Sequence, residues 1–224
     1  MAEGLHKQDQ RWQEFIEGVV YANAQAPWRN DPAFALIVES PGLRASLGGR
    51  IAGALTQTIG LVRALAQVDL LEVTRASRPS QGLCLGFGMN ILEPYDLLRV
   101  FALDRVHAYE WVGEHVVEAA QALEALRAED AFLPTRIRLH HGTLSNLTAI
   151  ADASIQVIYT ANVFNHEIPM TPETFAEAMG EIVRVLAAGG VVLSRGSSGA
   201  LEERLARHGR MLLQTPLVSV FQKE

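Results

Sequence analysis

A glycine-containing turn follows a short apolar run in the segment L83-C-L-G-F-G-M-N90. Ligands of α/β proteins bind at strand-to-helix turns on the carboxyl edge of a parallel sheet. Gly86 and Gly88, on either side of Phe87, permit a tight turn and a close approach of the backbone to a ligand. Asn90 is one of the few residue types that tolerate a positive φ. The spacing favours a cofactor loop, although a glycine pair after a strand is also typical of a plain tight turn.

An acidic residue ends the next predicted strand, V106-H-A-Y-E110. A carboxylate roughly 20 residues beyond the glycine turn can accept hydrogen bonds from both hydroxyls of a ribose. Glu110 and the glycines together therefore predict an adenosine site. Trp111, which follows, offers an aromatic face to the adenine or packs against the next helix, and both alternatives stay open.

The segment from Thr160 to Pro169, with the sequence TANVFNHEIP, holds an adjacent base and acid, His166 and Glu167. A histidine titrates near neutral pH, so His166 could take a proton from a substrate; the alternative is a capping or packing histidine. His140 and His141 do not join this pair in a metal site, because neighbouring strand residues point to opposite faces of a sheet. We predict no metal.

Three further residues are candidates for substrate contact. Arg195 follows the fifth predicted strand and could hold an anionic group, or it could be a solvated loop arginine. Tyr21 and Trp28 flank loop breaks near the N-terminus. They could line a lid over an acceptor pocket, although aromatic residues beside a helical stripe usually belong to the core.

Two regions with different patterns must position these residues. Residues 1–80 carry helical apolar stripes, over about 5–23 and 51–73, and predict an N-terminal helical cap. Residues 81–224 alternate short apolar runs with amphipathic helices, as in βαβ units with a parallel sheet. The predicted strands cover about 82–86, 105–109, 136–140, 155–160 and 190–194. The clearest predicted helices are 112–127 and 171–186, and a last helix is predicted near 200–207.

The last two predicted strands are Met211–Gln214 and Leu217–Gln222, with only Thr215 and Pro216 between them. So short a connection requires an antiparallel hairpin. A parallel sheet that ends in an antiparallel hairpin restricts the possible folds considerably.

Composition limits the function classes. The 224 residues are 49% hydrophobic and 20% charged, enough for one sizeable core. A net charge of -6 without a cluster of Lys and Arg argues against nucleic acid or an anionic membrane as partner. The chain shows no signal peptide and no apolar run of about 18 residues, so we expect a cytoplasmic protein. The single cysteine, Cys84, is expected to be a small buried hydrophobe.

The run from Gln81 to Leu193 resembles the class I S-adenosylmethionine-dependent methyltransferases. The segment L83–N90 lies where that family has its glycine-rich first motif, and A108-Y-E-W-V112 where it has the acidic ribose ligand. The other matching segments are L139-H-H-G-T-L-S-N146 at the adenine, D152–H166 at the fourth strand, and F175–L193 at the following helix and fifth strand.

The resemblance implies a three-layer αβα Rossmann-like methyltransferase fold, with a seven-stranded, mostly parallel sheet and an antiparallel last strand. It implies S-adenosylmethionine as cofactor, with Gly142, Thr143 and Leu144 near the adenine and Asn162 facing the methyl-donor end. The expected reaction is methyl transfer to oxygen or nitrogen of a small-molecule acceptor under the cap; a homodimer stays open.

The chain departs from the family pattern at four positions. Cys84 stands where the family has an acid that orders the loop at the methionine end, Asn90 replaces a glycine, and Thr143 and Gln156 replace aspartates. These changes keep a second interpretation open, a methyltransferase-like partner subunit or binder without turnover. A nicotinamide-dependent oxidoreductase is less favoured, because Ile91 occupies the last glycine position of that fingerprint.

Overall fold

The computed structural model of the chain describes residues 55, 59, 62–63, 66–75, 80–88, 91–126, 133–164, 170–197, 199–215 and 218–224. The candidate residues Tyr21, Trp28, Asn90, His166 and Glu167 lie outside the described residues. Their proposed roles therefore stay predictions.

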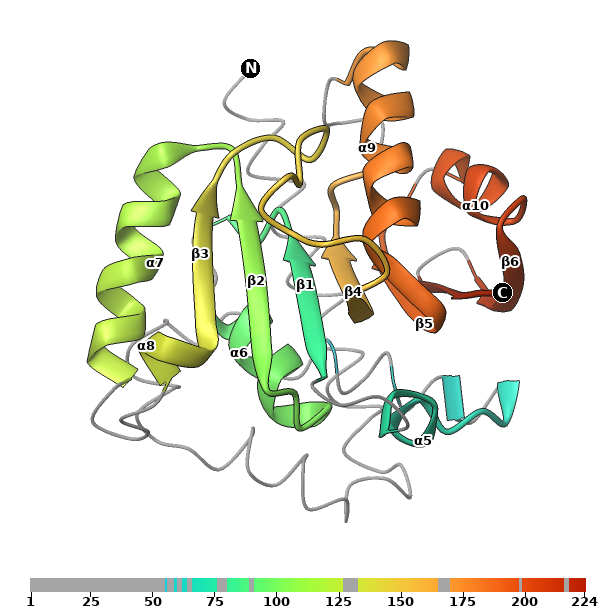
Figure 1. Cartoon of the computed structure of the whole chain (residues 1–224), viewed down its shortest axis with the longest axis horizontal. Helices are drawn as coiled ribbons and strands as arrows, with labels where there is room; N and C mark the ends of the chain where they lie inside the picture. Colours follow the sequence, from blue (N-terminus) through green and yellow to red (C-terminus); the bar gives the residue numbers. More distant parts are fainter. Residues whose placement is uncertain are drawn as a thin grey trace, which may run out of the picture.

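A seven-stranded sheet forms the centre of the fold, in the order β3-β2-β1-β4-β5-β7-β6 (Figure 1). The strands β1 to β5 pair in parallel, and β7 runs antiparallel between β5 and β6. Both the mostly parallel sheet and the closing hairpin that we expected are thus confirmed. The bounds are β1 Gln81–Leu85, β2 Arg105–Glu110, β3 Ile137–His141, β4 Ile155–Ala161, β5 Leu186–Arg195, β6 Gly209–Gln214 and β7 Val218–Lys223.

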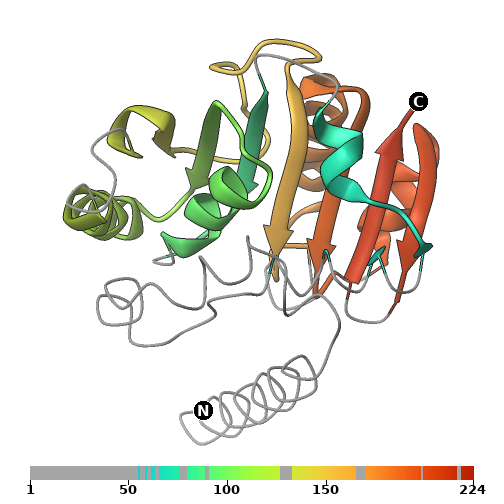
Figure 2. The ribbon, with the colours of Figure 1, turned by 90° about the horizontal axis from the view of Figure 1, so that it is seen from below.

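Helices cover both faces of the sheet and complete the predicted three layers. Figure 2 shows α5 on one face and α9 and α10 on the other. Residues of α5, α6 and α7 belong to one apolar cluster, which we call the α6-side core. Residues of α9 and α10 belong to the cluster on the opposite face, the α9-side core. The bounds are α5 Leu70–Arg75, α6 Leu92–Val100, α7 Gly113–Leu126, α8 Leu133–Arg136, α9 Pro172–Val185 and α10 Ala200–Leu205.

The helix α9 illustrates how local sequence sets an element. The Thr171 hydroxyl caps the helix by accepting the Thr174 N–H at 3.2 Å, and Pro172 occupies the first turn, where no N–H is needed. An apolar stripe then recurs at helical spacing and is buried on the sheet: Ala178, Met179, Ile182 and Val185. The helix ends at Val185, directly before β5, as the sequence predicted to within one residue.

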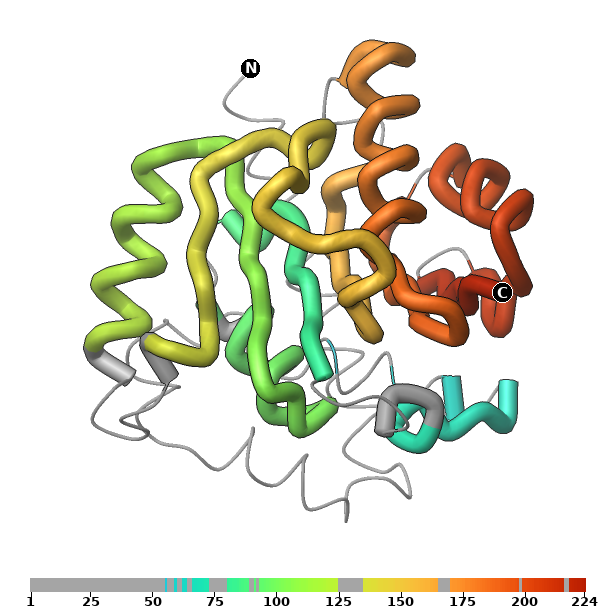
Figure 3. Tube along the Cα trace, in the orientation of Figure 1, coloured from blue at the N-terminus to red at the C-terminus, as the bar shows by residue number. Residues whose placement is uncertain are grey.

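The connection between β3 and β4 covers the sheet on the α9 side without forming a helix. Figure 3 shows this segment crossing in front of the strands. Its residues Leu147 and Ile150 are buried in the α9-side core. Arg184 of α9 donates to the carbonyl oxygens of both residues at 3.0 Å. The Glu181 carboxylate accepts the Leu147 N–H at 2.7 Å, so one Glu–Arg pair secures the segment.

The predicted continuous helix over 51–73 is wrong at residues 67–69. Leu55, Ile59, Val62 and Ala66 are helical, but Gln67 has a φ of 55° and α5 begins anew at Leu70. The reason is a local cap, because the Asp69 carboxylate accepts the Leu71 N–H at 3.0 Å. No described helix is long and apolar enough to cross a membrane.

We predict that Arg184→Met lowers the free energy of unfolding by about 1–3 kcal/mol, because two buried carbonyl groups lose their donor. Urea unfolding monitored by circular dichroism measures this change. Arg204→Met, on the exposed side of α10, is the control and should shift stability by no more than about 0.5 kcal/mol. Equal effects of the two changes would contradict the role given to Arg184.

Candidate cofactor site

The turn after β1 is held in a conformation that its glycines make possible. Gly86 and Gly88 have φ angles of 65° and 57°, and the Gly86 N–H donates to the Tyr109 carbonyl at 2.8 Å. Phe87 between them is buried in the α6-side core, so only its backbone is available to a ligand. The predicted contribution of Phe87 is thereby limited to its main chain.

Glu110, the last residue of β2, fixes this turn. Its side chain is 3% exposed, and its Oε2 accepts the Gly88 N–H at 2.9 Å. Its Oε1 accepts the Val112 N–H at 3.0 Å, just before α7 begins. Each carboxylate oxygen has two acceptor positions, so Glu110 keeps capacity for the hydroxyls of a ligand while it orders the turn.

The two glycines have different surroundings. A Cβ at Gly86 would overlap with the Val163 side chain, which follows β4, so the turns after β1 and β4 pack directly together. A Cβ at Gly88 would meet no atom within 4 Å. The backbone of Gly88 therefore borders open space beside a fixed carboxylate, which suits the close approach of a ligand.

Trp111 is 70% exposed, next to Glu110. This exposure leaves most of the ring open to solvent, so little of it packs against α7. Its carbonyl oxygen lies 3.0 Å from the His141 Nε2, which connects the ends of β2 and β3. A large aromatic ring left in solvent beside a buried acid is available for a planar ligand.

The residues after β3 come to the same edge. The Gly142 N–H donates to the Glu110 carbonyl at 3.0 Å, and the exposed Thr143 has its hydroxyl 3.1 Å from that of Ser145. The Leu144 side chain instead packs against the α9-side core. Gly142 is thus brought beside Glu110, exposed Thr143 follows it, and Leu144 packs on the core.

The ends of β4 and β5 are joined at this edge as well. Asn162 has a φ of 57°, and its N–H donates to the Arg195 carbonyl at 2.9 Å. The Asn162 side-chain oxygen lies against Gly196, where a Cβ would not fit. We expected Arg195 just beyond the fifth strand. In the structure it is the last residue of β5.

The two histidines of β3 point to opposite faces, as the strand alternation requires. His140 stacks on Tyr109 at a ring distance of 4.4 Å and lies 3.0 Å from the His107 Nδ1. Burial is the main cause that lowers the pKa of His107 to about 4. His141 faces Gly113 at the start of α7. Among the described residues no group of His, Cys, Asp and Glu side chains is placed to hold a metal ion.

Two of the departures from the family pattern have structural explanations. Cys84 is fully buried, and burial raises the pKa of its thiol, which agrees with its predicted role as a hydrophobe. The Gln156 Oε1 accepts the Gln81 N–H at 2.5 Å and so ties the start of β4 to β1. Gln156 thus serves the sheet.

Sequence reasoning missed an acid with an enclosed oxygen atom at the start of α6. Glu93, in the first turn of α6, has an inaccessible Oε2 without a hydrogen-bond partner among the described residues. Burial is the first cause, and the neighbouring Asp96 the second, that raise the pKa of Glu93 to about 8. The hydroxyl of the fully buried Tyr159 is also unpartnered within that part of the chain. The residues from Glu93 to Asp96 offer only a weak signal, because acids are common in the first turn of a helix.

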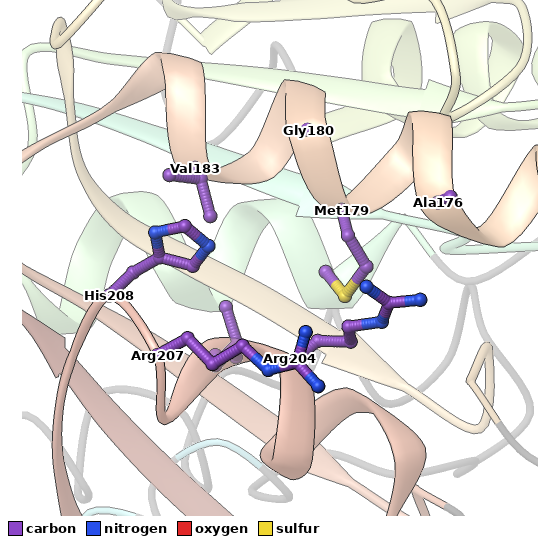
Figure 4. Close-up of a pocket in the computed structure, with 8 residues that line it drawn as sticks. Ala176, Met179, Gly180, Val183, Arg204, Arg207 and His208 are labelled. Atoms are coloured by element: carbon purple, nitrogen blue, oxygen red, sulfur yellow. The ribbon is translucent and has the colours of Figure 1, made fainter.

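A separate pocket of about 230 Å³ lies between α9 and α10 (Figure 4). Its apolar lining comes mainly from α9, and cationic side chains border it from the α10 side. The lining residues are Ala176, Met179, Gly180, Val183, Arg204, Leu205, Arg207 and His208. None of the candidate site residues lines it, so it is distinct from the site at the β1 turn.

Residues 83–194, half of the chain, match a family model described as a methyltransferase domain. The chain belongs to the class I S-adenosylmethionine-dependent methyltransferases. The match spans the β1 turn, Glu110, Gly142 and the end of β4, which together form the carboxyl edge described above. The cofactor of this family is S-adenosylmethionine.

Solved structures agree in fold. A methyltransferase from Geobacter sulfurreducens is similar over 91% of this chain and 93% of its own, with 18% identity and a TM-score of 0.51. A methyltransferase-like protein from Streptococcus mutans, crystallised with S-adenosylhomocysteine, is similar over 69% of this chain and 93% of its own, with 13% identity and a TM-score of 0.51. A search of curated proteins finds no match.

We predict that Gly86→Ala destabilises the protein more than Gly88→Ala. Both changes place a side chain at positive φ, which costs about 1–2 kcal/mol. Gly86→Ala adds an overlap with Val163, for a total of about 2–4 kcal/mol. Urea denaturation midpoints at constant m-value measure the difference, and a smaller loss for Gly86→Ala would disprove the packing of the two turns.

The raised pKa of Glu93 predicts a pH dependence of stability. The folded protein retains the proton up to about pH 8, whereas the unfolded chain releases it near the ordinary pKa of 4.5. Stability should therefore fall as the pH rises through this window, by at most about 1.4 kcal/mol per pH unit. His107 acts in the opposite sense between about pH 4 and 6.5, so the clearest range is pH 6.5 to 8.

Urea unfolding of the wild type and of Glu93→Gln over that range tests this prediction. The variant should lose the decline, because glutamine has no proton to release. Glu118→Gln on exposed α7 is the matched control and should keep the wild-type profile. Parallel profiles of all three proteins would show that Glu93 titrates normally.

Proposed function

We propose that this protein transfers a methyl group from S-adenosylmethionine to oxygen or nitrogen of a small molecule. The observation that carries the proposal is the Glu110 carboxylate, which is buried at the end of β2 and holds the Gly88 N–H at 2.9 Å. A fixed acid beside an open glycine backbone is the arrangement that binds a ribose.

The surrounding residues fit the adenosine part of the cofactor. The open flank of Gly88 leaves room at the turn, exposed Trp111 offers a face for the adenine, and the Thr143 hydroxyl can hydrogen-bond a ring nitrogen or amine. Asn162 lies at the end of β4, beside Arg195. When bound, S-adenosylmethionine supplies a methyl group on a sulfonium sulfur.

The chain must align the acceptor with that methyl group. It must also accept the proton that the acceptor loses. His166, with Glu167 beside it, is our candidate base in the segment after β4. Arg195 at the end of β5 is our candidate for an anionic group of the acceptor. We further propose that residues 1–80, with Tyr21 and Trp28, form a cap over the acceptor.

A small acceptor is supported by the charge of the chain. A net charge of -6 disfavours the phosphate contacts that nucleic-acid binding needs. The second candidate function, a partner subunit or binder without turnover, rests on Cys84, which occupies the position of an acid in the family. The two candidates differ in whether methyl transfer takes place, so activity measurements separate them once cofactor binding is established.

Calorimetric titration with S-adenosylmethionine and S-adenosylhomocysteine tests the proposal. We expect micromolar binding that Glu110→Ala abolishes, because the turn loses its anchor and the ribose its acceptor. Trp111→Ala is the companion variant that we expect to fold normally, since its side chain is 70% exposed. Loss of the adenine contact should weaken binding by about 3-fold to 10-fold.

The fluorescence of Trp111 provides a second readout, because a bound adenine should quench it. Trp111→Phe identifies the responsible tryptophan, since Trp12 and Trp28 remain in that variant. A folded wild type that binds neither compound would disprove the proposed function.

A further inference from the structure

Several acidic side chains lie near the carboxyl edge of the sheet, around the β1 turn. Burial raises the pKa of the Cys84 thiol in β1, and the carboxyl groups of Glu93, Glu110 and Asp96 raise it further. Arg195 of β5 faces the same cluster and acts on the pKa of Glu93 in the opposite sense. The acids outnumber this cation.

Strand geometry places Tyr159 in the same cluster. Tyr159 is the register partner of Cys84 in the β1–β4 pairing, and both side chains belong to the α6-side core. Arg195 follows the α6-side residue Leu193 by two positions in β5, so it points to that face as well. Tyr159 is 0% exposed and its hydroxyl has no hydrogen-bond partner among the described residues.

A purely structural role does not account for this arrangement. The Glu93 Oε2 and the Tyr159 hydroxyl are both inaccessible and unpartnered within the described part of the chain. A buried polar atom without a partner costs about 1–3 kcal/mol, and leucine at position 93 would avoid that cost. Two such atoms in one acidic cluster favour a cationic hydrogen-bond donor as their ligand.

We propose that Glu93 is the carboxylate that binds the α-ammonium group of the cofactor's methionine end. It compensates from α6 for the acid that is absent at Cys84 in β1. This inference rests on the proposed function and goes beyond it, because it assigns a residue outside the matched glycine motif to a defined group of the cofactor.

The proton balance follows from the same geometry. In the free protein Glu93 is mostly a neutral carboxylic acid at pH 7, because burial raises its pKa to about 8. Pairing with an ammonium group favours the carboxylate, so the proton passes to the buffer while the ammonium keeps its own. Cys84, Asp96, Glu110, Tyr159 and Arg195 are the titratable and charged groups that face Glu93 from β1, α6, β2, β4 and β5.

Two ligands isolate the ammonium group. S-adenosylhomocysteine carries it, whereas 5′-methylthioadenosine keeps the adenosine and the thioether but lacks both the ammonium and the carboxylate. Calorimetry at pH 7 with the full chain should show Glu93→Gln weakening S-adenosylhomocysteine by about 10-fold to 100-fold. Binding of 5′-methylthioadenosine should change by no more than about twofold.

The number of protons released on binding tests direct contact, because a merely structural role of Glu93 would not change it. Titrations in two buffers of different ionisation enthalpy should show that the wild type releases about one proton per S-adenosylhomocysteine at pH 7. Glu93→Gln should release none. Glu118→Gln, which makes the same side-chain exchange on exposed α7, should behave as the wild type in affinity and in proton release.

The outcomes separate this inference from the proposed function. If the wild type binds neither ligand, both the proposed function and this inference are wrong. If the wild type binds both ligands and Glu93→Gln binds S-adenosylhomocysteine equally well, only this inference is wrong. An equal loss for both ligands would also overturn it, since Glu93 would then shape the turn and not contact the ammonium.

Discussion

The buried carboxylate of Glu110 is the interaction on which the candidate site depends. Its two oxygens hold the N–H groups of Gly88 and Val112, while its own carbonyl accepts the Gly142 N–H. One residue thereby joins the turn after β1, the start of α7 and the segment after β3. Backbone N–H groups at such ends would otherwise be without partners, so the acid orders three connections at once.

The turns after β4 and β5 are fixed by close packing more than by charge. Val163 fills the space beside Gly86, and Asn162 fills the space beside Gly196. Each contact needs a glycine at positive φ, since a side chain would collide with the neighbouring strand end. The five parallel strands therefore end in one connected edge, which suits a cofactor that touches several of them.

The polar cluster at β1 and β4 surrounds the position where Cys84 replaces the acid of the family motif. In the proposal made above, Glu93 of α6 takes over the role of the acid that Cys84 replaces in β1. A carboxylate acts through its position and environment, so its place in the sequence is secondary. Residues of α6 and of β1 belong to the same apolar cluster, so the two elements pack together.

The sequence by itself determined the sheet, the closing hairpin and the position of Glu110. Alternating apolar periods predict strands and helices, and the Thr171 cap predicts the start of α9, because these signals act over a few neighbouring residues. The tertiary structure alone decided that Trp111 stays exposed, that Leu144 turns into the core, and that a helix breaks at Gln67. It also revealed Glu93 and Tyr159, since burial and missing partners arise only when distant elements pack together.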